Sequence, residues 1–260
     1  MRIFSLRALI LGLGLLLVVA VDVASGERPK VGFLTSIDEP DGELTVTLKD
    51  GRVLEGRLEG ASSLFGSVTK MTVKTLDGQK HNLRADEIVE IVMPVDDLWR
   101  AVMVNKSRDS VEEIWKTDFE RIFEVKELTF HGVRHPRSKR VAVRQLINPG
   151  FESRIRVYEL PNSKEGVSEG DGISWFGGMS KAYLVIKDDG EVQRVKQREY
   201  PSKVFPKLYE DCPELLERFT GDRRKFKFFA EHVYIYDHIC PGPGSPTYPA
   251  GGEDPRPEQP

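Results

Sequence analysis

The sequence lacks the short motifs that mark the commonest catalytic sites. No serine lies in a Gly-x-Ser-x-Gly turn, and no glutamate follows His131, so the zinc-protease pattern His-Glu-x-x-His is absent. The glycine-rich stretch WFGGMSK, residues 175–181, lacks the Gly-x-x-x-x-Gly-Lys-Ser/Thr phosphate cradle. Carboxylates are spread along the chain, and no pair is placed as an acid and a base. These absences favour a protein that is not an enzyme and that holds no cofactor and no metal.

The chain also lacks an excess of positive charge. Its 38 Lys and Arg residues are outnumbered by 41 Asp and Glu residues, which gives a formal net charge of −3. Affinity for nucleic acid at physiological salt depends on clustered cations that neutralise phosphates. The charge balance therefore argues against a general binder of nucleic acids or other polyanions.

Only one long apolar run is present. Arg2 and Arg7 precede the uncharged run from Ala8 to Val21, and the small residues of Val23 to Gly26 suit signal peptidase. This order predicts a secretory signal at residues 1–25, and hence a secreted or periplasmic protein. The run has roughly 14 residues, whereas a spanning helix needs about 20. The alternative is a protein tethered to the membrane by an uncleaved anchor. Because no cysteine lies at the cleavage site and no second apolar run follows, we expect a soluble mature chain without a lipid anchor.

Cysteine is nearly absent, since Cys212 and Cys240 are the only two. In an exported protein an even pair is a candidate disulfide. A closed loop of about 29 residues would stabilise the fold by on the order of 3 kcal/mol in the chain-entropy model. The alternative is a pair of free thiols, either buried or kept reduced by the compartment.

The last residues, 241–260, are rich in proline and glycine and contain almost nothing apolar. Such a segment cannot bury enough surface to offset its chain entropy. We therefore expect a disordered tail.

Residues 42–93 have the pattern of short antiparallel strands. Apolar and polar residues alternate in LTVTL, residues 44–48, as in a half-buried strand. Asp50-Gly51 and Asp77-Gly78 are hairpin signals, because a two-residue type I′ turn needs positive φ at both positions. The pattern predicts a small five-stranded barrel within residues 30–95, with strands near residues 44–48, 52–59, 67–76, 79–84 and 88–93.

The stretch VTLKDGRVLEGRLEG…DEIVEI resembles the Sm-like and SH3-like small barrels. In those folds a strand ending in Lys-Asp-Gly-Arg bends into a glycine-containing second strand, and a short Ile-x-x-Ile strand closes the sheet. The resemblance covers residues 42–93 and implies the fold. It does not reach the RNA-binding pattern of Sm proteins, because SSLFGSVTK lacks the loop Asp and Asn and no glycine follows Arg84. Residues 30–95 also carry 8 basic and 11 acidic residues, so we expect a structural or protein-contacting barrel that does not bind nucleic acid.

The pattern after the barrel predicts a helical connector and then an α+β domain. In the connector, residues 96–127, Asp96 and Asp97 can cap a first helix, and Ser110 with Glu113 fits a capping box for a second. Residues 128–240 show strand-like alternation first and helical spacing later. The expected strands are residues 140–147 and 153–160, joined by a turn at Asn148-Pro149-Gly150, and a hairpin that turns at Asp189-Gly190.

This second part also carries a resemblance. QLINPGFESRIRVYE, GGMSKAYLVIKDDGE and EDCPELLERF resemble segments of uncharacterised exported bacterial proteins of the cell envelope. In those proteins a short β-meander leads to a Cys-Pro-containing helix and to a closing helix that ends in Cys. The resemblance covers about residues 140–240. It implies that Cys212 pairs with Cys240, and it implies an envelope location without assigning any catalytic residue.

Two groups of histidines are candidate metal ligands. His131 and His135 would share one face of a helix, but Gly132 and Pro136 indicate a strand that enters a turn. Four other potential ligands cluster near the end of the second domain, and among these an oxidised cysteine could not supply a thiolate: His232, Asp237, His238 and Cys240. We expect no metal at either place.

One segment is strongly asymmetric in charge. No Asp or Glu occurs between Leu128 and Phe151, while five cations cluster there: Arg134, Arg137, Lys139, Arg140 and Arg144. An exported basic segment can meet an acidic lipid headgroup, an anionic glycan or an acidic protein. The simpler interpretation is an exposed loop whose charge is balanced by acids elsewhere.

Together these patterns predict an exported, non-catalytic binding or structural protein of the bacterial cell envelope. Its partner would be a protein or an anionic envelope component. The alternative is a secreted enzyme whose site lies in the glycine-rich loop at residues 161–180 and uses Trp175 and the histidines.

Overall fold

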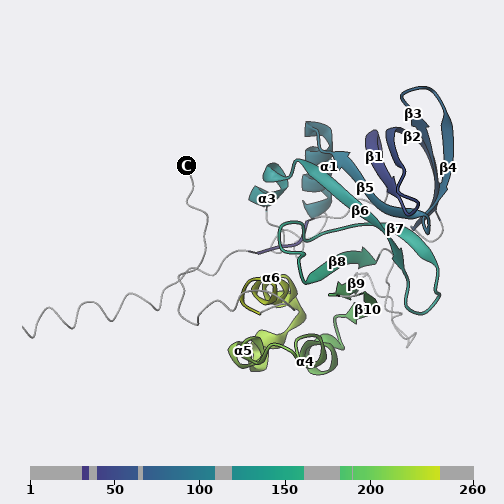
Figure 1. Cartoon of the computed structure of the whole chain (residues 1–260). Coiled ribbons are helices and arrows are strands. Elements are labelled where there is room, and N and C mark those ends of the chain that lie inside the picture. The colour runs from purple at the N-terminus through teal and green to yellow at the C-terminus, as the bar shows by residue number, and fades with distance from the viewer. Residues whose placement is uncertain are drawn as a thin grey trace, which may run out of the picture. The chain divides into compact units, whose positions relative to one another are not determined.

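The computed structural model describes most of the chain between Val31 and Cys240 (Figure 1). The described residues are 31–34, 40–63, 67–108, 119–160, 182–188 and 190–240. Four predicted features lie outside them: the signal at 1–25, the capping box at Ser110, the glycine-rich loop at 161–180 and the tail at 241–260. Among the described residues, no helix is long and apolar enough to cross a membrane.

Six antiparallel strands close into a barrel. They are β1 (Glu43–Leu48), β2 (Val53–Ser63), β3 (Val68–Thr75), β5 (Ile88–Pro94), β6 (Glu127–Arg134) and β7 (Val141–Gln145). Neighbours pair in the order β2-β1-β5-β6-β7-β3, and the pairing of β2 with β3 closes the ring. A further strand, β4 (Lys80–Arg84), pairs with β3 alone. The small antiparallel barrel predicted from the sequence is confirmed.

The predicted number of five strands is wrong, since the ring has six strands and β4 is not one of them. Both β6 and β7 follow the predicted barrel segment, and β6 pairs along β5. At β3, the pair Val68–Val143 joins β7, whereas the residues from Lys70 to Lys74 pair with β4. Two strands therefore share one edge of β3, and the ring closes through β7.

Local sequence explains the first two hairpins, although not as type I′ turns. Gly51 has φ +87° and Gly78 has φ +86°, while the aspartate before each glycine has negative φ. Each loop therefore has three residues, with glycine in the left-handed position. Asp50 Oδ1 accepts the Arg52 N–H at 3.0 Å, and Asp77 Oδ1 accepts the Gln79 N–H at 3.2 Å. These bonds satisfy backbone groups that the ladder leaves unpaired.

The alternating pattern of the strands fills the barrel core. Val46, Val73 and Ile91 are fully buried. Two helices add to the same core through Met103 of α1 (Asp97–Arg108) and Ile122 of α3 (Phe119–Glu124). As predicted, an aspartate caps the first helix: Asp96 Oδ1 accepts the Trp99 N–H at 2.9 Å.

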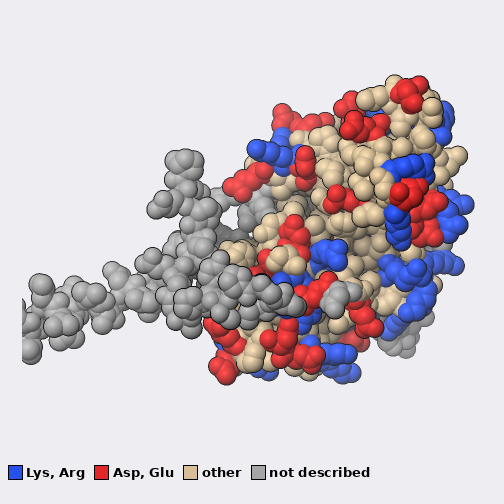
Figure 2. All heavy atoms as spheres, in the orientation of Figure 1, with Lys and Arg blue, Asp and Glu red and all other residues tan. Residues whose placement is uncertain are grey.

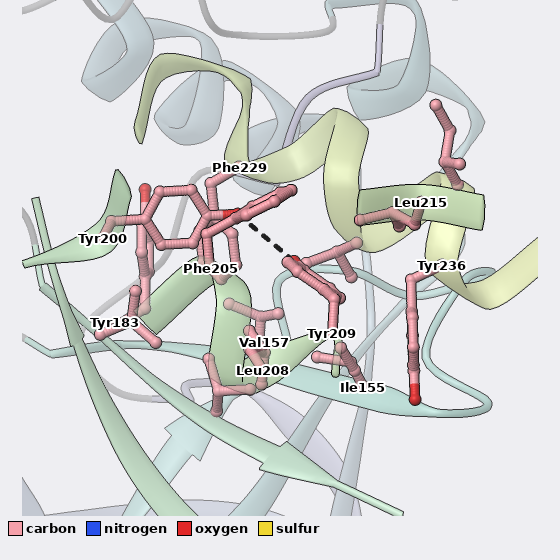
Figure 3. Close-up of a cluster of buried hydrophobic side chains, with 14 of the residues drawn as sticks. Ile155, Val157, Tyr183, Tyr200, Phe205, Leu208, Tyr209, Leu215, Phe229 and Tyr236 are labelled. Carbon is pink, nitrogen blue, oxygen red and sulfur yellow. Dashed lines mark hydrogen bonds between the residues drawn. The ribbon is translucent and has the colours of Figure 1, made fainter. Parts of the chain in front are cut away.

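A three-stranded sheet and several short helices form a second core, which makes the chain α+β as predicted. The sheet has the order β10 (Glu191–Lys196), β9 (Ala182–Lys187), β8 (Ile155–Leu160). The helical elements are a π-helical turn (Tyr200–Val204), α4 (Phe205–Leu208), α5 (Pro213–Arg218), two 3₁₀ turns (Gly221–Arg224 and Phe226–Phe228) and α6 (Phe229–Ile239). Figure 3 shows their aromatic rings gathered against Ile155 and Val157 of the sheet. The Tyr200 and Tyr209 hydroxyls lie 3.4 Å apart within this cluster.

The predicted disulfide between Cys212 and Cys240 is confirmed. It joins the start of α5 to the end of α6, with a Cα–Cα distance of 5.6 Å. Arg154 lies beside it and donates to the Cys240 carbonyl at 3.0 Å. The same guanidinium binds both carboxylate oxygens of Asp188 at 3.1 Å and Asp211 Oδ2 at 3.0 Å. One buried cation thus ties the ends of β8, β9 and α6 to the loop before α5.

Removing the bridge should destabilise the fold. We expect the double substitution Cys212→Ser and Cys240→Ser to lower the free energy of unfolding by about 3 to 4 kcal/mol, because the unfolded chain regains the freedom of a closed loop. Urea denaturation with and without dithiothreitol measures this. Reductant should shift the wild-type midpoint and leave the serine variant, the control, unchanged. An unshifted wild-type midpoint would contradict a stabilising bridge.

Gly132 of β6 is a second point of sensitivity, because the turn between β4 and β5 crosses it closely. A Cβ atom at Gly132 would overlap the Ala85 carbonyl oxygen and lie 2.9 Å from that of Ile88. We expect Gly132→Ala to lower the free energy of unfolding by about 2 kcal/mol, since backbone must move. Gly60→Ala is the matched control: it is also in a strand, and its Cβ would meet nothing within 4 Å. Equal stabilities of the two variants in urea would refute the close approach.

Candidate functional site

The loop between β6 and β7 is held in one shape by its own hydrogen bonds. The His135 N–H donates to the Arg140 carbonyl at 2.8 Å, and the Lys139 N–H donates to the His135 carbonyl at 2.9 Å. His135 Nδ1 accepts the N–H groups of Arg137 and Ser138, each at 3.2 Å. Lys139 has φ +58°, so the chain reverses there. This loop presents its cations on a fixed support.

Four of the five predicted cations lie exposed on this hairpin: Arg134, Arg137, Lys139 and Arg140. None of the four forms an ion pair with a carboxylate in the described part of the chain. Arg134 Nη1 donates to the Lys139 carbonyl at 3.2 Å. Figure 2 shows Lys and Arg side chains gathered at the lower right of the view, where Figure 1 places the hairpin. The interpretation that acids elsewhere balance this charge stays a prediction, because some of the acids lie outside the described residues.

Arg144, the fifth predicted cation, is not part of the exposed group. It is 8% exposed and lies behind the hairpin. Its guanidinium donates to Ser67 Oγ at 2.7 Å and to the Glu159 carbonyl at 3.4 Å, while its Nε has no hydrogen-bond partner among the described residues. Burial lowers the pKa of Arg144 to about 10. The side chain adds a charge beneath the hairpin that no described carboxylate neutralises through an ion pair.

A sixth cation, Arg194 of β10, reaches the same region, and the sequence did not indicate it. Burial lowers the pKa of His135, and the charges of Arg194, Arg144 and Arg137 lower it further. Arg194 is half-buried, and its Nε has no hydrogen-bond partner in the described part of the chain. It lies 50 residues after Arg144 in the chain, so no local pattern could have joined the two. A neutral His135 keeps Nδ1 free of a proton and able to accept the loop N–H groups.

Comparisons of the chain with protein-family models, with curated proteins and with solved structures found no match.

The resemblance of residues 140–240 to exported envelope proteins therefore has no family match behind it. Besides the basic hairpin, the described residues include two buried polar clusters, which contain His131 and His232.

The first cluster joins the barrel to the second sheet. His131 Nδ1 lies 2.9 Å from the Tyr158 hydroxyl, and His131 Nε2 lies 3.5 Å from Glu90 Oε1. Burial lowers the pKa of His131, although the negative charge of Glu90 raises it in part. Burial also raises the pKa of Tyr158. A carboxylate, an imidazole and a phenol in this order resemble a proton relay. Tyr158 is fully buried, and the contacts of this cluster join β5, β6 and β8.

The second cluster contains His232 of α6. The Tyr200 hydroxyl lies 2.6 Å from His232 Nδ1, and the Arg223 carbonyl lies 2.9 Å from His232 Nε2. Both nitrogens are therefore engaged, and burial lowers the pKa of His232 to about 3. The other three residues weighed with it are occupied separately: Asp237 accepts from Ser153 and Arg154, His238 contacts the Tyr234 carbonyl, and Cys240 is oxidised. No group of three potential metal ligands comes together among the described residues.

The burial of neutral His232 makes stability depend on pH. Unfolding restores the ordinary pKa of 6.5. As the pH falls, the unfolded state therefore binds a proton near pH 6.5, whereas the folded state binds it only near pH 3. Its stabilising effect is complete above pH 6.5 and is lost as the pH falls below that value. Between pH 7 and pH 5 the loss should be about 2 kcal/mol.

The measurement is the free energy of unfolding across this range for the wild type and for His232→Gln. The variant has lower stability at neutral pH but should lose about 2 kcal/mol less on acidification. His131 and His135 remain in both proteins, so their contributions cancel in the comparison. Parallel curves for the two proteins would show that His232 does not titrate as argued.

Proposed function

We propose that this chain is a non-catalytic binding protein of an extracytoplasmic compartment, and that its β6–β7 hairpin contacts an anionic surface of the bacterial cell envelope. The observation that carries the proposal is the group of four exposed cations that share one hairpin and form no ion pair with a described carboxylate. Arg144 and Arg194 extend the positive charge behind them.

The support that holds these cations favours binding. Fixing a loop before it meets a partner reduces the entropy lost on association. The His135 imidazole and two backbone bonds already fix this loop. Surface potential from several cations on one face attracts anionic headgroups or polymers over about 8 Å at physiological salt.

The disulfide supports an extracytoplasmic location. Disulfides form and persist in oxidising environments such as the periplasm and the extracellular space. The bridge between Cys212 and Cys240 is buried and sits among structural contacts of the second core. An exported location also agrees with the signal predicted at residues 1–25.

The buried polar groups support a non-catalytic role. Tyr158 and His232 are buried and hydrogen-bonded, and burial shifts their pKa values away from neutrality. The alternative enzyme site at residues 161–180 lies outside the described residues.

A vesicle-binding experiment tests the proposal. The triple variant Arg137→Gln, Lys139→Asn and Arg140→Gln removes three charges, and asparagine tolerates the positive φ of position 139. Since each cation near an anionic surface contributes about 1 kcal/mol, binding to phosphatidylglycerol vesicles should weaken by about 100-fold at low salt.

The matched control is Lys203→Gln, Lys207→Gln and Arg218→Gln, which removes the same charge from exposed side chains in the helical part of the second core. This control should bind within about twofold of the wild type. Equal loss in both triple variants, or no binding of the wild type at low salt, would rule out the hairpin as a lipid-binding surface. Binding to an anionic glycan but not to vesicles would identify the polymer as the partner.

A further inference from the structure

The strand β4 has one free edge. In the hairpin with β3, the Thr75 N–H donates to the Gln79 carbonyl, and the Ala85 N–H donates to the Thr69 carbonyl. Because hydrogen-bonded pairs alternate in an antiparallel ladder, His81 and Leu83 also bond to β3. Lys80 and Asn82 therefore point their N–H and C=O groups away from the sheet. Neither residue has a backbone partner on that side among the described residues, and in Figure 1 β4 lies at the margin of the barrel.

The free edge is short and sharply limited. At its end, the Arg84 N–H donates to Glu87 Oε2 at 2.7 Å, and the Glu87 N–H donates to the Arg84 carbonyl at 2.9 Å. Only Lys80 and Asn82 are thus open to a partner. They offer two donors and two acceptors, which match one face of an extended chain.

A groove of about 470 Å³ runs beside this edge. Residues of β4 form one side, and the turn between β1 and β2 forms the other through Lys49 and Asp50. Leu48 and Leu83 supply apolar lining. An edge with a groove beside it differs from a flat free edge, because alternate side chains of an added strand can enter the groove.

The charges around the edge select the occupant. On the face that carries Lys80 and Arg84, the cross-strand partners are Lys74 and Lys70 of β3. Glu59 pairs with both Lys74 and Lys80, and Asp86 pairs with Arg84, so two carboxylates offset part of the charge of the four cations. A second β4 added antiparallel would bring Lys80 near Arg84, and like charges opposite one another destabilise a sheet. A strand with acids at alternate positions has the complementary charge.

From this geometry we infer that the free edge of β4 is a strand-addition site for an extended acidic peptide. The backbone of the peptide bonds to Lys80 and Asn82. Its acidic side chains lie over the cations of β3 and β4, and its alternate apolar side chains enter the groove lined by Leu48 and Leu83. This site is separate from the β6–β7 hairpin and does not depend on the function proposed for it.

The inference is tested with a short synthetic peptide in which glutamate and valine alternate, and with its lysine–valine counterpart. Asn82→Pro removes one outward N–H at an edge position where proline is tolerated. It should weaken binding of the acidic peptide by about tenfold or more, as measured by calorimetry. Asn82→Ala, the matched control, keeps the backbone donor and should bind within about twofold of the wild type. Equal binding by the proline and alanine variants would overturn strand addition.

Amide exchange in the wild-type chain gives a second readout that does not require the proline variant to fold. The amides of Lys80 and Asn82 should exchange quickly in the free protein and become protected by the acidic peptide. The amides of His81 and Leu83 should be protected in both states, since they bond to β3. Unchanged exchange at Lys80 and Asn82 with saturating peptide would reject the site, and equal binding of the lysine–valine peptide would reject the charge selection.

Discussion

The pairing of β5 with β6 is the constraint on which both proposed surfaces depend. It brings β6 and β7 into the ring, where Val143 of β7 pairs with Val68 at the start of β3. The loop between β6 and β7, which carries the exposed cations, is therefore anchored by two barrel strands. The same closure leaves β4 with a single neighbour. If the barrel were closed through β4, the free edge of β4 would be hydrogen-bonded to another barrel strand and closed to a partner.

Two buried arginines among the described residues show how differently a cation can be enclosed. Arg154 and Arg144 are each 8% exposed. Burial alone would lower the pKa of Arg154, but hydrogen bonds and charges from Asp188 and Asp211 raise it. Arg144 has only a hydroxyl and a carbonyl, and its pKa falls. The Arg154 network, which closes against the disulfide, can therefore stabilise the second core, whereas the enclosure of Arg144 opposes folding through its desolvation.

The sequence predicts local features of this chain well and long-range pairing poorly. Alternation located the strands, and the aspartate–glycine pairs located the hairpins, because both effects act over a few residues. Periodicity does not say which strand edge meets which, so neither the entry of β6 and β7 into the ring nor the exclusion of β4 was predicted. The burial of Arg144 was missed for a related reason. It follows three apolar residues in β7, but its hydrogen-bond partners are Ser67 and Glu159, which no local spacing connects to it. The cysteine pair was predictable because two residues allow only one intramolecular bridge.

The two surfaces attract partners by different physics, and this difference separates their roles. The β6–β7 hairpin offers charge at long range, and added salt screens such attraction. The β4 edge offers backbone hydrogen bonds and a groove with Leu48 and Leu83, which depend on contact and respond weakly to salt. Its nearby cations are already partly paired with Glu59 and Asp86. They therefore contribute more to the specificity for acidic peptides than to the affinity. A protein with both surfaces can associate with an anionic envelope through the hairpin while the barrel edge remains free to hold a second, extended partner.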